Sequence, residues 1–516
     1  MVYVADADMN DRMIEILKST GKPIRQIKGD EQKPTVIIHH TTTKIAQSEL
    51  LKYVGAGKTG VFQCDSIRTA NIAYEDAKAT APAEYKILLV HGKNKDEFEQ
   101  AAYLRSPNEI GKQYDLIILT PVVSSGFSIE LEYDFHVGVF SGQLSPTEII
   151  QTLGRNRKAK DIILGLSPKR KQKSLSVAEQ LTGIVSAEGR ITSIGGQLIH
   201  VPNEFDKVAA GVMEEYESSC ERFAHTTLLI LMQKGYQVEE LKEPESLIII
   251  KGTAKAVKDK HVQDVIQADS ISAIEYGNLK KSSKVTEDEH NAIEKFECRE
   301  QLALGEEVSE KDIQLWNDGK LAPALKNSEI VNGEQDNAQS LDKHESAMKI
   351  APKDRTYATS KMIIFHTVMS LLQGKSLHPP YLLKKGTDKL SITHNNVYLS
   401  PSPENTGISL QRYDAERIKA AIDYLQDNYQ EVHAAGLGNF KDVNRKLDTR
   451  TLGQFLKRFG LKHKRVGKNL AGNYQITEDS LIQMQDINKR RKAKKISVYN
   501  QSQAWSKSID GIKMAA

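Results

Sequence analysis

Two arginines in the first third of the chain have the type and spacing to act on a phosphate group. Arg155 and Arg157 lie in the segment Gln151-Thr-Leu-Gly-Arg-Asn-Arg157. Phosphoryl transfer spreads negative charge over the phosphoryl oxygens, and a planar guanidinium that stays charged stabilises that charge. Gln151 and Gly154 complete the segment as candidate nucleotide contacts. The alternative is a basic surface helix whose apolar side packs against a core.

A loop of small and hydroxyl-bearing residues precedes this segment. It follows an apolar stretch at 116–119 and reads Thr120-Pro-Val-Val-Ser-Ser-Gly-Phe-Ser128. Hydroxyl and backbone N–H groups suit phosphate oxygens without reading a base sequence, and open α/β sheets bind ligands at the carboxyl ends of their strands. Thr120, Ser124, Gly126 and Ser128 are the residues of this loop that are suited to contact phosphate oxygens. A plain turn built on Ser-Ser-Gly is the alternative.

A parallel sheet is expected to position both segments, because short β-branched stretches alternate with helical patterns up to residue 168. The expected strands are 2–5, 35–40, 60–64, 87–91, 115–120, 135–140 and 161–164, and the expected helices include 11–18, 45–54 and 66–80. Ser145-Pro-Thr-Glu148 has the capping-box pattern with proline at the first helical position. A helix that carries Gln151 to Arg157 should therefore begin there.

The segment Gly55-Ala-Gly-Lys-Thr59 contains the Gly-Lys-Thr of a phosphate-binding loop. The full pattern requires glycine at position 52, where this chain has Lys52, and it requires a strand before the loop and a helix after it. Here a helical stretch precedes the glycines and a strand follows them. We interpret the segment as the glycine turn that ends a helix, with Lys58 as an ATP ligand as the alternative.

Positive charge is concentrated near the end of the chain. Residues 441–495 contain 16 Lys and Arg and five Asp and Glu, whereas the whole chain has a net charge of +4. Helices are predicted at 415–425, 440–447 and 448–460, followed by a β-hairpin at 461–477, and this order resembles a winged helix. In the third helix Leu452, Phe455, Leu456 and Phe459 share one face, Asp448 caps the start and Gly460 the end. The alternatives are a helical protein-interaction domain and a solubilising basic tail.

The winged-helix interpretation predicts which basic residues contact DNA. The third helix would enter the major groove through Arg450, Gln454 and Lys457, with Arg458 on the same face. The residues expected to neutralise phosphates around the hairpin are Lys462, Lys464, Arg465 and Lys468. The segment 489–495, Lys-Arg-Arg-Lys-Ala-Lys-Lys, is predicted to be a disordered tail that adds affinity independent of base sequence.

Composition narrows the protein class. Charged residues make up 27% and apolar residues 39%, and no apolar stretch approaches the length of a membrane span. The N-terminus has neither the basic start nor the apolar stretch of a signal peptide. Cys64, Cys220 and Cys298 are too widely spaced for a metal site and are interpreted as buried or incidental thiols. We expect a cytoplasmic protein with no membrane partner and no bound metal of its own.

The motifs resemble those of a known motor family. QxxGRxR after TxxxxxGxS, at this separation, resembles motifs VI and V of superfamily 2 helicases. The resemblance implies a second RecA-like domain whose Arg155 and Arg157 face the γ-phosphate held by the first domain, and a loop at 120–128 that contacts nucleic acid. Gly60-Val-Phe-Gln-Cys-Asp-Ser66 resembles motif IV. Val4-Ala-Asp-Ala-Asp-Met-Asn10, with Asp6 and Asp8, resembles the coupling motif III.

The resemblance also implies a missing half. Motifs I and II, which hold the triphosphate and Mg²⁺, normally lie before motif III, and only three residues precede it here. ATP and Mg²⁺ are therefore expected only if a partner polypeptide or an upstream segment supplies the first RecA-like domain, and the chain is not expected to hydrolyse ATP alone. Residues 203–241 resemble the segment after the motor in plasmid replication proteins of the cyanobacterial type, which are relatives of origin-binding helicases.

These observations predict a DNA-binding replication protein of a plasmid, phage or other mobile element. Its alternatives are a non-catalytic origin-binding or adaptor protein and a fragment of a larger replicative helicase. The expected fold is α/β, with a parallel-sheet RecA-like domain, a mainly helical region and a C-terminal winged-helix-like domain. The expected domain order is a first-domain remnant at 1–22, the second RecA-like domain at 23–170, a helical accessory region at 171–325, a linker at 326–345, a connecting region at 346–409, a winged-helix-like domain at 410–482 and a basic tail at 483–516.

Overall fold

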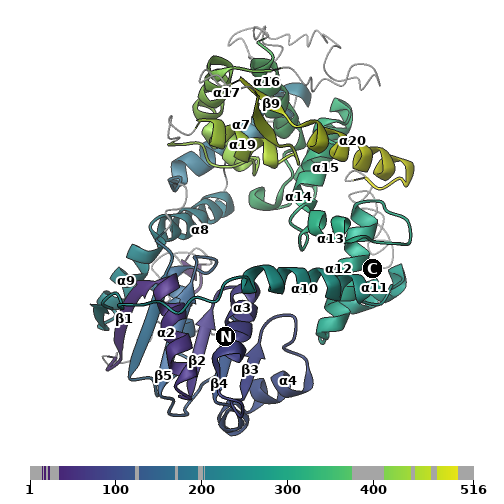
Figure 1. The fold of residues 1–516 in the computed structure, drawn as a ribbon. Coiled ribbons are helices and arrows are strands. Elements are labelled where there is room, and N and C mark those ends of the chain that lie inside the picture. The colour runs from purple at the N-terminus through teal and green to yellow at the C-terminus, as the bar shows by residue number, and fades with distance from the viewer. Residues whose placement is uncertain are drawn as a thin grey trace. The chain divides into compact units, whose positions relative to one another are not determined.

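The computed structural model describes residues 34–122, 127–168, 173–195, 204–374, 412–442, 448–466 and 473–497, with Pro202 and a few positions before residue 34. The chain forms two compact units (Figure 1). Unit 1 consists of Met1–Lys171 and Tyr216–Ile293, and unit 2 consists of Gln172–Glu215 and Glu294–Ala516. The first segment of unit 1 ends at Lys171, and the expected accessory region at 171–325 is divided between the units.

Unit 1 contains a seven-stranded parallel sheet in the order β3-β4-β2-β5-β6-β1-β7. Its strands are β1 (Ile37–Thr42), β2 (Gly60–Cys64), β3 (Ile87–Val90), β4 (Leu116–Leu119), β5 (Phe135–Phe140), β6 (Asp161–Leu166) and β7 (Gln237–Glu240). The predicted α/β class with a parallel sheet is confirmed. The strand expected at 2–5 lies outside the described residues, as does most of the helix expected at 11–18.

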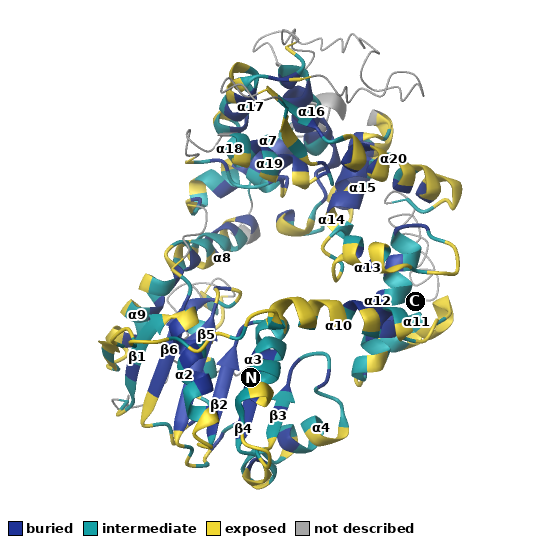
Figure 2. Ribbon diagram, viewed as in Figure 1, coloured by how far each residue is buried: buried dark blue, intermediate teal, exposed yellow. Residues whose placement is uncertain are grey.

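Helices cover both faces of this sheet, because the side chains of each strand alternate between two cores. On one face Phe62 and Ile118 pack against helices α2 (Thr43–Gly55) and α3 (Ile67–Thr80). On the other face the helices are α4 (Phe98–Arg105), α6 (Pro146–Leu153) and α9 (Phe223–Gln233). The central strands β2, β4 and β5 are buried throughout (Figure 2).

The edge strand β7 was not predicted from the sequence. It reads Gln-Val-Glu-Glu and is mostly exposed, so it lacks the apolar pattern of the central strands. Its position depends on backbone pairing with β1, in which Gln237 lies opposite Ile37.

The strand order creates a crossing point beside β2. Strands β4 and β5 are consecutive along the chain but lie on opposite sides of β2. The connections that leave such strands diverge, and open α/β sheets bind ligands in the crevice outside the carboxyl ends at that position. The segments after β2, β4 and β5 are therefore where a site is expected.

The remaining helices of unit 1 and the helices that span the unit boundaries are α5 (Pro107–Ile110), α8 (Glu204–Glu221), α10 (Thr253–Gln267), α11 (Ala273–Lys281) and α12 (Glu287–Gln301). Unit 2 contains α7 (Val177–Gly195), α13 (Glu310–Trp316), α14 (Ala322–Val331), α15 (Gln335–Ala347), α16 (Ala358–Leu372), α17 (Ala415–Asp427), α18 (Tyr429–Ala434), α19 (Asp448–Lys457) and α20 (Glu478–Ala493), with the antiparallel hairpin β8 (His463–Val466) and β9 (Asn473–Ile476).

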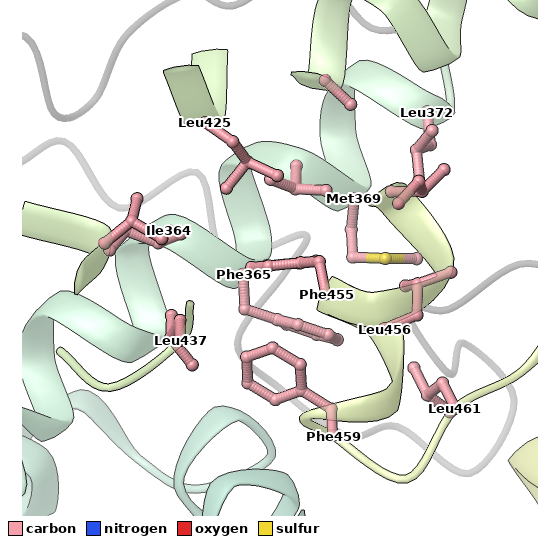
Figure 3. Close-up of a cluster of buried hydrophobic side chains, with 14 of the residues drawn as sticks. Ile364, Phe365, Met369, Leu372, Leu425, Leu437, Phe455, Leu456, Phe459 and Leu461 are labelled. Atoms are coloured by element: carbon pink, nitrogen blue, oxygen red, sulfur yellow. The ribbon is translucent and has the colours of Figure 1, made fainter. Parts of the chain in front are cut away.

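The core of unit 2 forms around α16 (Figure 3). Phe365 of this helix lies 4.5 Å from Phe459 between ring centroids, and Phe459 lies 5.2 Å from Phe455 of α19. Ile422 of α17 and Val331 of α14 belong to the same cluster. We call α17, α18, α19 and the β8–β9 hairpin the C-terminal module. This module and the helices α14 and α16 are thus parts of one folded core.

The predicted linker at 326–345 is wrong, because α14 and α15 occupy this segment. Its polar composition has a structural use. The carboxylate of Asp342 accepts hydrogen bonds from the backbone N–H groups of Ala358 and Thr359 at 2.7 and 2.8 Å, which satisfies the start of α16. Glu345 accepts from the backbone and the hydroxyl of Thr356. Both carboxylates are buried, so acidic residues here hold a fold together.

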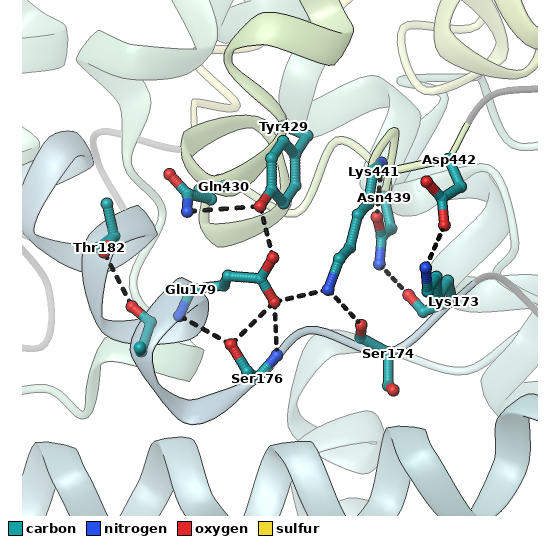
Figure 4. Close-up of polar contacts among 11 residues, drawn as sticks. Lys173, Ser174, Ser176, Glu179, Thr182, Tyr429, Gln430, Asn439, Lys441 and Asp442 are labelled. Carbon is teal, nitrogen blue, oxygen red and sulfur yellow. Dashed lines mark hydrogen bonds and ion pairs between the residues drawn. The ribbon is translucent and has the colours of Figure 1, made fainter.

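A polar cluster attaches α7 to the C-terminal module (Figure 4). The Glu179 carboxylate accepts hydrogen bonds from the Lys441 ammonium at 2.6 Å and from the Tyr429 hydroxyl at 2.5 Å. Burial alone would raise the pKa of Glu179, but these bonds and those from Ser176 lower it to about 2. Gly183, one turn further along α7, allows close packing, because a Cβ there would lie 2.2 Å from the carbonyl oxygen of Gln430.

Two expectations about the C-terminal region are wrong. The second helix is α18 (Tyr429–Ala434), whereas Phe440 to Asp442 form an irregular turn and 443–447 lie outside the described residues. The segment 489–495 is not a disordered tail, since α20 extends to Ala493. Arg491 is 4% exposed and forms an ion pair with Glu329 at 3.1 Å. An apolar stripe through Leu481, Met484 and Ile487 brings this arginine into the core.

Candidate functional site

The structure brings the two polar segments of unit 1 together at one edge of the sheet. The backbone N–H of Ile129 donates to the carbonyl of Arg155 at 2.8 Å, and the N–H of Arg157 donates to the carbonyl of Ile129 at 3.0 Å. The bridge between Ile129 and Asn156 is parallel. A loop after β4 and the turn after α6, which are separated in the sequence, therefore form one structural feature.

The capping box that starts α6 is confirmed. The Ser145 side chain accepts from the backbone of Glu148 while the Glu148 carboxylate accepts from the backbone of Ser145, and Pro146 occupies the first helical position. Ile149, Ile150 and Leu153 are buried, whereas Gln151 and Gly154 are exposed. The helix thus packs its apolar side into the core and presents its polar side outward.

The two candidate arginines differ in their surroundings. The Arg155 side chain is half-buried and donates through Nη1 to the carbonyl of Phe127 at 3.3 Å. The Arg157 side chain is 68% exposed and lies 3.9 Å from the Glu130 carboxylate. An exposed pair of this kind contributes little to stability. Arg157 is therefore available to an incoming anion, whereas Arg155 first braces the loop that precedes it.

The loop between Thr120 and Ser128 is described only at its ends. Thr120 is buried at the carboxyl end of β4, and its N–H donates to the Val90 carbonyl. Ser128 is half-buried and its hydroxyl donates to Glu130 at 3.4 Å. Ser124 and Gly126 lie outside the described residues, as do Asp6 and Asp8.

Asp65 organises this edge, a role that its place in the segment resembling motif IV did not predict. It follows β2 directly and is 7% exposed. Its carboxylate accepts hydrogen bonds from the backbone N–H groups of Ser141, Gly142 and Gln143 at 2.8 to 2.9 Å, and from the Ser141 hydroxyl at 3.0 Å. It therefore fixes the loop that leads from β5 to α6. The only sequence signal was an acidic residue at the end of a buried strand.

A second buried group ties α6 to the sheet. The Gln63 side-chain nitrogen donates to the Thr152 carbonyl at 3.1 Å, and its oxygen lies 2.8 Å from Nε2 of His136 on β5. Burial lowers the pKa of His136 to about 3, so its imidazole is neutral near pH 7. Both residues are buried, which indicates a structural role.

The Gly-Lys-Thr segment is a helix-ending turn, as interpreted from the sequence. Helix α2 ends at Gly55, and Gly57 has a φ of +68°. The N–H of Lys58 donates to the carbonyl of Tyr53, and that of Gly57 to Val54, which is the pattern of a Schellman motif. Because β2 follows it, the turn lies at the amino end of that strand. Open α/β sheets bind ligands at the opposite end, outside the carboxyl ends of their strands.

The basic face of α19 has the predicted arrangement. Leu452, Phe455, Leu456 and Phe459 are at most 1% exposed. Arg450, Gln454, Lys457 and Arg458 are all exposed, as are Lys462, Lys464 and Arg465 around β8. Gly460 has a φ of +74°, and its N–H closes the helix end on Lys457. Lys468 lies outside the described residues.

The hairpin is attached to the start of α17. The backbones of Tyr413 and Tyr474 pair antiparallel, with hydrogen bonds of 2.9 and 2.8 Å. The Tyr413 hydroxyl lies 3.0 Å from Nδ1 of His463 on β8, and burial lowers the pKa of that histidine. These contacts hold the basic strand β8 in a fixed position beside α19.

The cysteines, the helix lengths and the comparisons with known proteins add no further candidate site among the described residues. Cys64, Cys220 and Cys298 are free and buried, as interpreted from their spacing. None of the described helices is long and apolar enough to cross a membrane. A comparison with protein-family models gave no match, and a comparison with curated proteins found no similar sequence.

Proposed function

We propose that this protein binds DNA through the C-terminal module formed by α17, α18, α19 and the β8–β9 hairpin. The observation that carries the proposal is that α19 has one apolar side and one basic side. One side is entirely buried in the core of unit 2, and the other exposes Arg450, Gln454, Lys457 and Arg458. A helix held this rigidly, with a cationic outer side, suits the major groove of a duplex.

The hairpin supplies the second part of the interface. Lys462 and Lys464 are exposed beside α19, and each cation placed near a phosphate releases a bound counterion. In this arrangement α19 contacts base edges through its first turn, where Arg450 lies, and the hairpin neutralises the backbone. The proposed module is thus a winged helix in which position and specificity come from different residues.

The test measures the affinity of the full chain for a labelled duplex by fluorescence anisotropy. Truncation is unsuitable, because α20 belongs to the folded core. Arg450→Ala should weaken binding at least about tenfold, since one charge-assisted contact contributes about 1.5–3 kcal/mol. Lys343→Ala is the matched control, because Lys343 is exposed on α15, outside the module. Equal affinities for wild type and Arg450→Ala would overturn the proposed role of α19.

A second proposed role concerns unit 1. We propose that Arg155 and Arg157 complete an ATPase site when another polypeptide or segment supplies a first RecA-like domain with ATP and Mg²⁺. The observation that favours this is the backbone pairing between Ile129 and the turn that carries both arginines. Bound ATP would supply the phosphoryl group, and the guanidinium of Arg157 would stabilise the charge that develops on it.

This role is tested by mixing the chain with the candidate partner and DNA. Hydrolysis should fall by at least about 10²-fold in Arg157→Ala, following the rate effects of arginine fingers. Lys160→Ala is the control, because Lys160 is exposed just before β6. Unchanged turnover in Arg157→Ala would favour the alternative in which unit 1 is a non-catalytic scaffold of an origin-binding protein. A role in replication of a plasmid, phage or mobile element rests on the resemblance of residues 203–241 and belongs to the same proposal.

A further inference from the structure

Unit 2 contains a pocket of about 570 Å³ next to α19. Five of the side chains that line it are cationic, namely Lys320, Lys326, Lys361, Lys457 and Arg458. Among the described residues that line it, none is Asp or Glu. The volume lies within the range of small-molecule sites. Lysines on a convex surface face water, which needs no further explanation. Five cationic side chains that line one pocket suggest a negatively charged ligand.

The pocket is built into the fold. The Asn327 side-chain nitrogen on α14 donates to the carbonyl of Arg458 at 3.0 Å, which joins α14 to the end of α19. Phe365 of α16 packs on Phe459, at the same end of α19. The cations therefore project from elements that share one core, and their mutual repulsion is not relieved by moving those elements apart.

Lys361 is the most constrained of these cations. It lies on α16, and burial, followed by repulsion from Lys326, lowers its pKa to about 8. Glu345 and Asp342 of α15 oppose this shift, but both carboxylates are engaged by the backbone at the start of α16. The Lys326 ammonium donates to the Thr356 hydroxyl at 2.9 Å. Two lysines are thus held near each other, and no Asp or Glu is among the described residues that line the pocket beside them.

Another part of the pocket lining is a glycine loop. Gly436 and Gly438 line the pocket with φ of +70° and +125°, conformations that side-chain-bearing residues rarely adopt. Bare backbone at this wall lets a ligand approach closely. Gln454 adds a neutral hydrogen-bonding group.

We propose that this pocket binds phosphate groups, presented either by a free nucleotide or by the backbone of nucleic acid. Phosphate is negatively charged. Lysine binds it as a point charge, and the planar guanidinium of arginine binds two of its oxygens at once. The pocket size favours a polyphosphate or nucleotide held within it. The proposal does not depend on the role of α19 in reading DNA, because three of the five cations, Lys320, Lys326 and Lys361, lie outside the proposed DNA-reading set.

The experiment titrates sodium triphosphate, ATP and a labelled duplex separately into the full chain. Calorimetry follows the first two probes and anisotropy the third. The variants are Lys361→Met and Lys320→Ala, neither of which belongs to the proposed DNA-reading set. Lys343→Ala is the control. Thermal melting establishes that each variant is folded, and Lys320 is exposed, so at least that substitution leaves the core intact.

Triphosphate or ATP binding that weakens at least about tenfold in both pocket variants, and is unchanged in Lys343→Ala, supports a free nucleotide as the source. If neither binds but both pocket variants weaken the duplex tenfold, the backbone is the source. The proposal is overturned if triphosphate, ATP and duplex each bind the variants as tightly as they bind wild type. It is also overturned if none of the three binds wild type. Arg450→Ala keeps the two proposals separate, because it should reduce duplex binding and leave triphosphate binding unchanged.

Discussion

The Asp65 carboxylate shapes the edge of the sheet through four hydrogen bonds to a loop that begins at Ser141. Those bonds set the path of the chain into α6 and thereby the position of the turn that carries Arg155 and Arg157. No periodicity reveals such a role, because its partners are backbone N–H groups about 76 residues further along the chain. The arginines themselves could be selected from their types and spacing.

Asp65→Ala should lower the free energy of unfolding by about 3 kcal/mol, because it leaves buried N–H groups without an acceptor. Ser141→Ala removes only the hydroxyl contact and should cost about 1 kcal/mol. Urea unfolding followed by circular dichroism measures both values. A loss for Asp65→Ala no larger than that for Ser141→Ala would contradict the assigned role of the carboxylate.

Lys361 provides a pH-dependent prediction. Its pKa in the folded chain is about 8, below the ordinary value of 10.5 for a lysine. Between these two pH values the unfolded state binds more protons than the folded state, so the stability of the folded state rises with pH. The buried charge lowers that stability fully below pH 8, and this effect disappears as pH rises toward 10.5. Lys361→Met should be more stable than wild type at pH 7, by up to about 3 kcal/mol, with a smaller advantage at pH 10. Lys343→Met, on an exposed site, should show no such trend in thermal melting, and a constant difference for Lys361→Met would contradict the account.

Among the elements, α7 docks through a close backbone contact and a polar cluster. Gly183 lies against the backbone of Gln430, and Glu179 binds Lys441 and Tyr429 one turn away (Figure 4). The sequence predicts none of this docking, because neither a single glycine nor a single glutamate in a helix identifies its partner. It does predict the central strands and the capping box of α6, since these depend on local residue patterns.

Gly183→Ala should destabilise unit 2 by about 2–3 kcal/mol, because the new methyl group would overlap a backbone carbonyl that cannot move independently of α18. Gly189→Ala is the matched control on the same helix, since a Cβ there meets nothing within 4 Å. It should stabilise the helix by about 0.5–1 kcal/mol. Equal effects of the two substitutions in urea unfolding would show that α7 does not dock as described.

The elements that escaped prediction share a physical cause. The segments 326–345 and 489–495 are rich in polar and charged residues, which favours a linker or a tail when only composition is considered. In the fold, Asp342 satisfies the start of α16 and Arg491 pairs with Glu329. Polar side chains that serve as caps and buried partners look the same in a sequence as side chains that face water.

For the whole molecule, the distribution of charge is the feature that relates fold to proposed function. The chain has a net charge of only +4, yet residues 441–495 contain 16 Lys and Arg. Some of these, such as Arg491, are used inside the core. Others are exposed on and beside α19 and β8, and a further group is exposed on α20 and directly after it. The polar side of α19 also lines the pocket that we propose binds phosphate. Sequence patterns located the basic face, but only the packing of α14 and α16 revealed the pocket beside it.

The central claim is that the exposed basic face of the C-terminal module binds DNA, and the salt dependence of duplex affinity tests it most directly. The logarithm of the association constant should fall linearly with the logarithm of salt concentration, and the double variant Lys462→Ala/Lys464→Ala should reduce the slope by about 2. Lys343→Ala should leave the slope unchanged. A slope identical in wild type and the double variant, or no duplex binding at low salt, would contradict the claim.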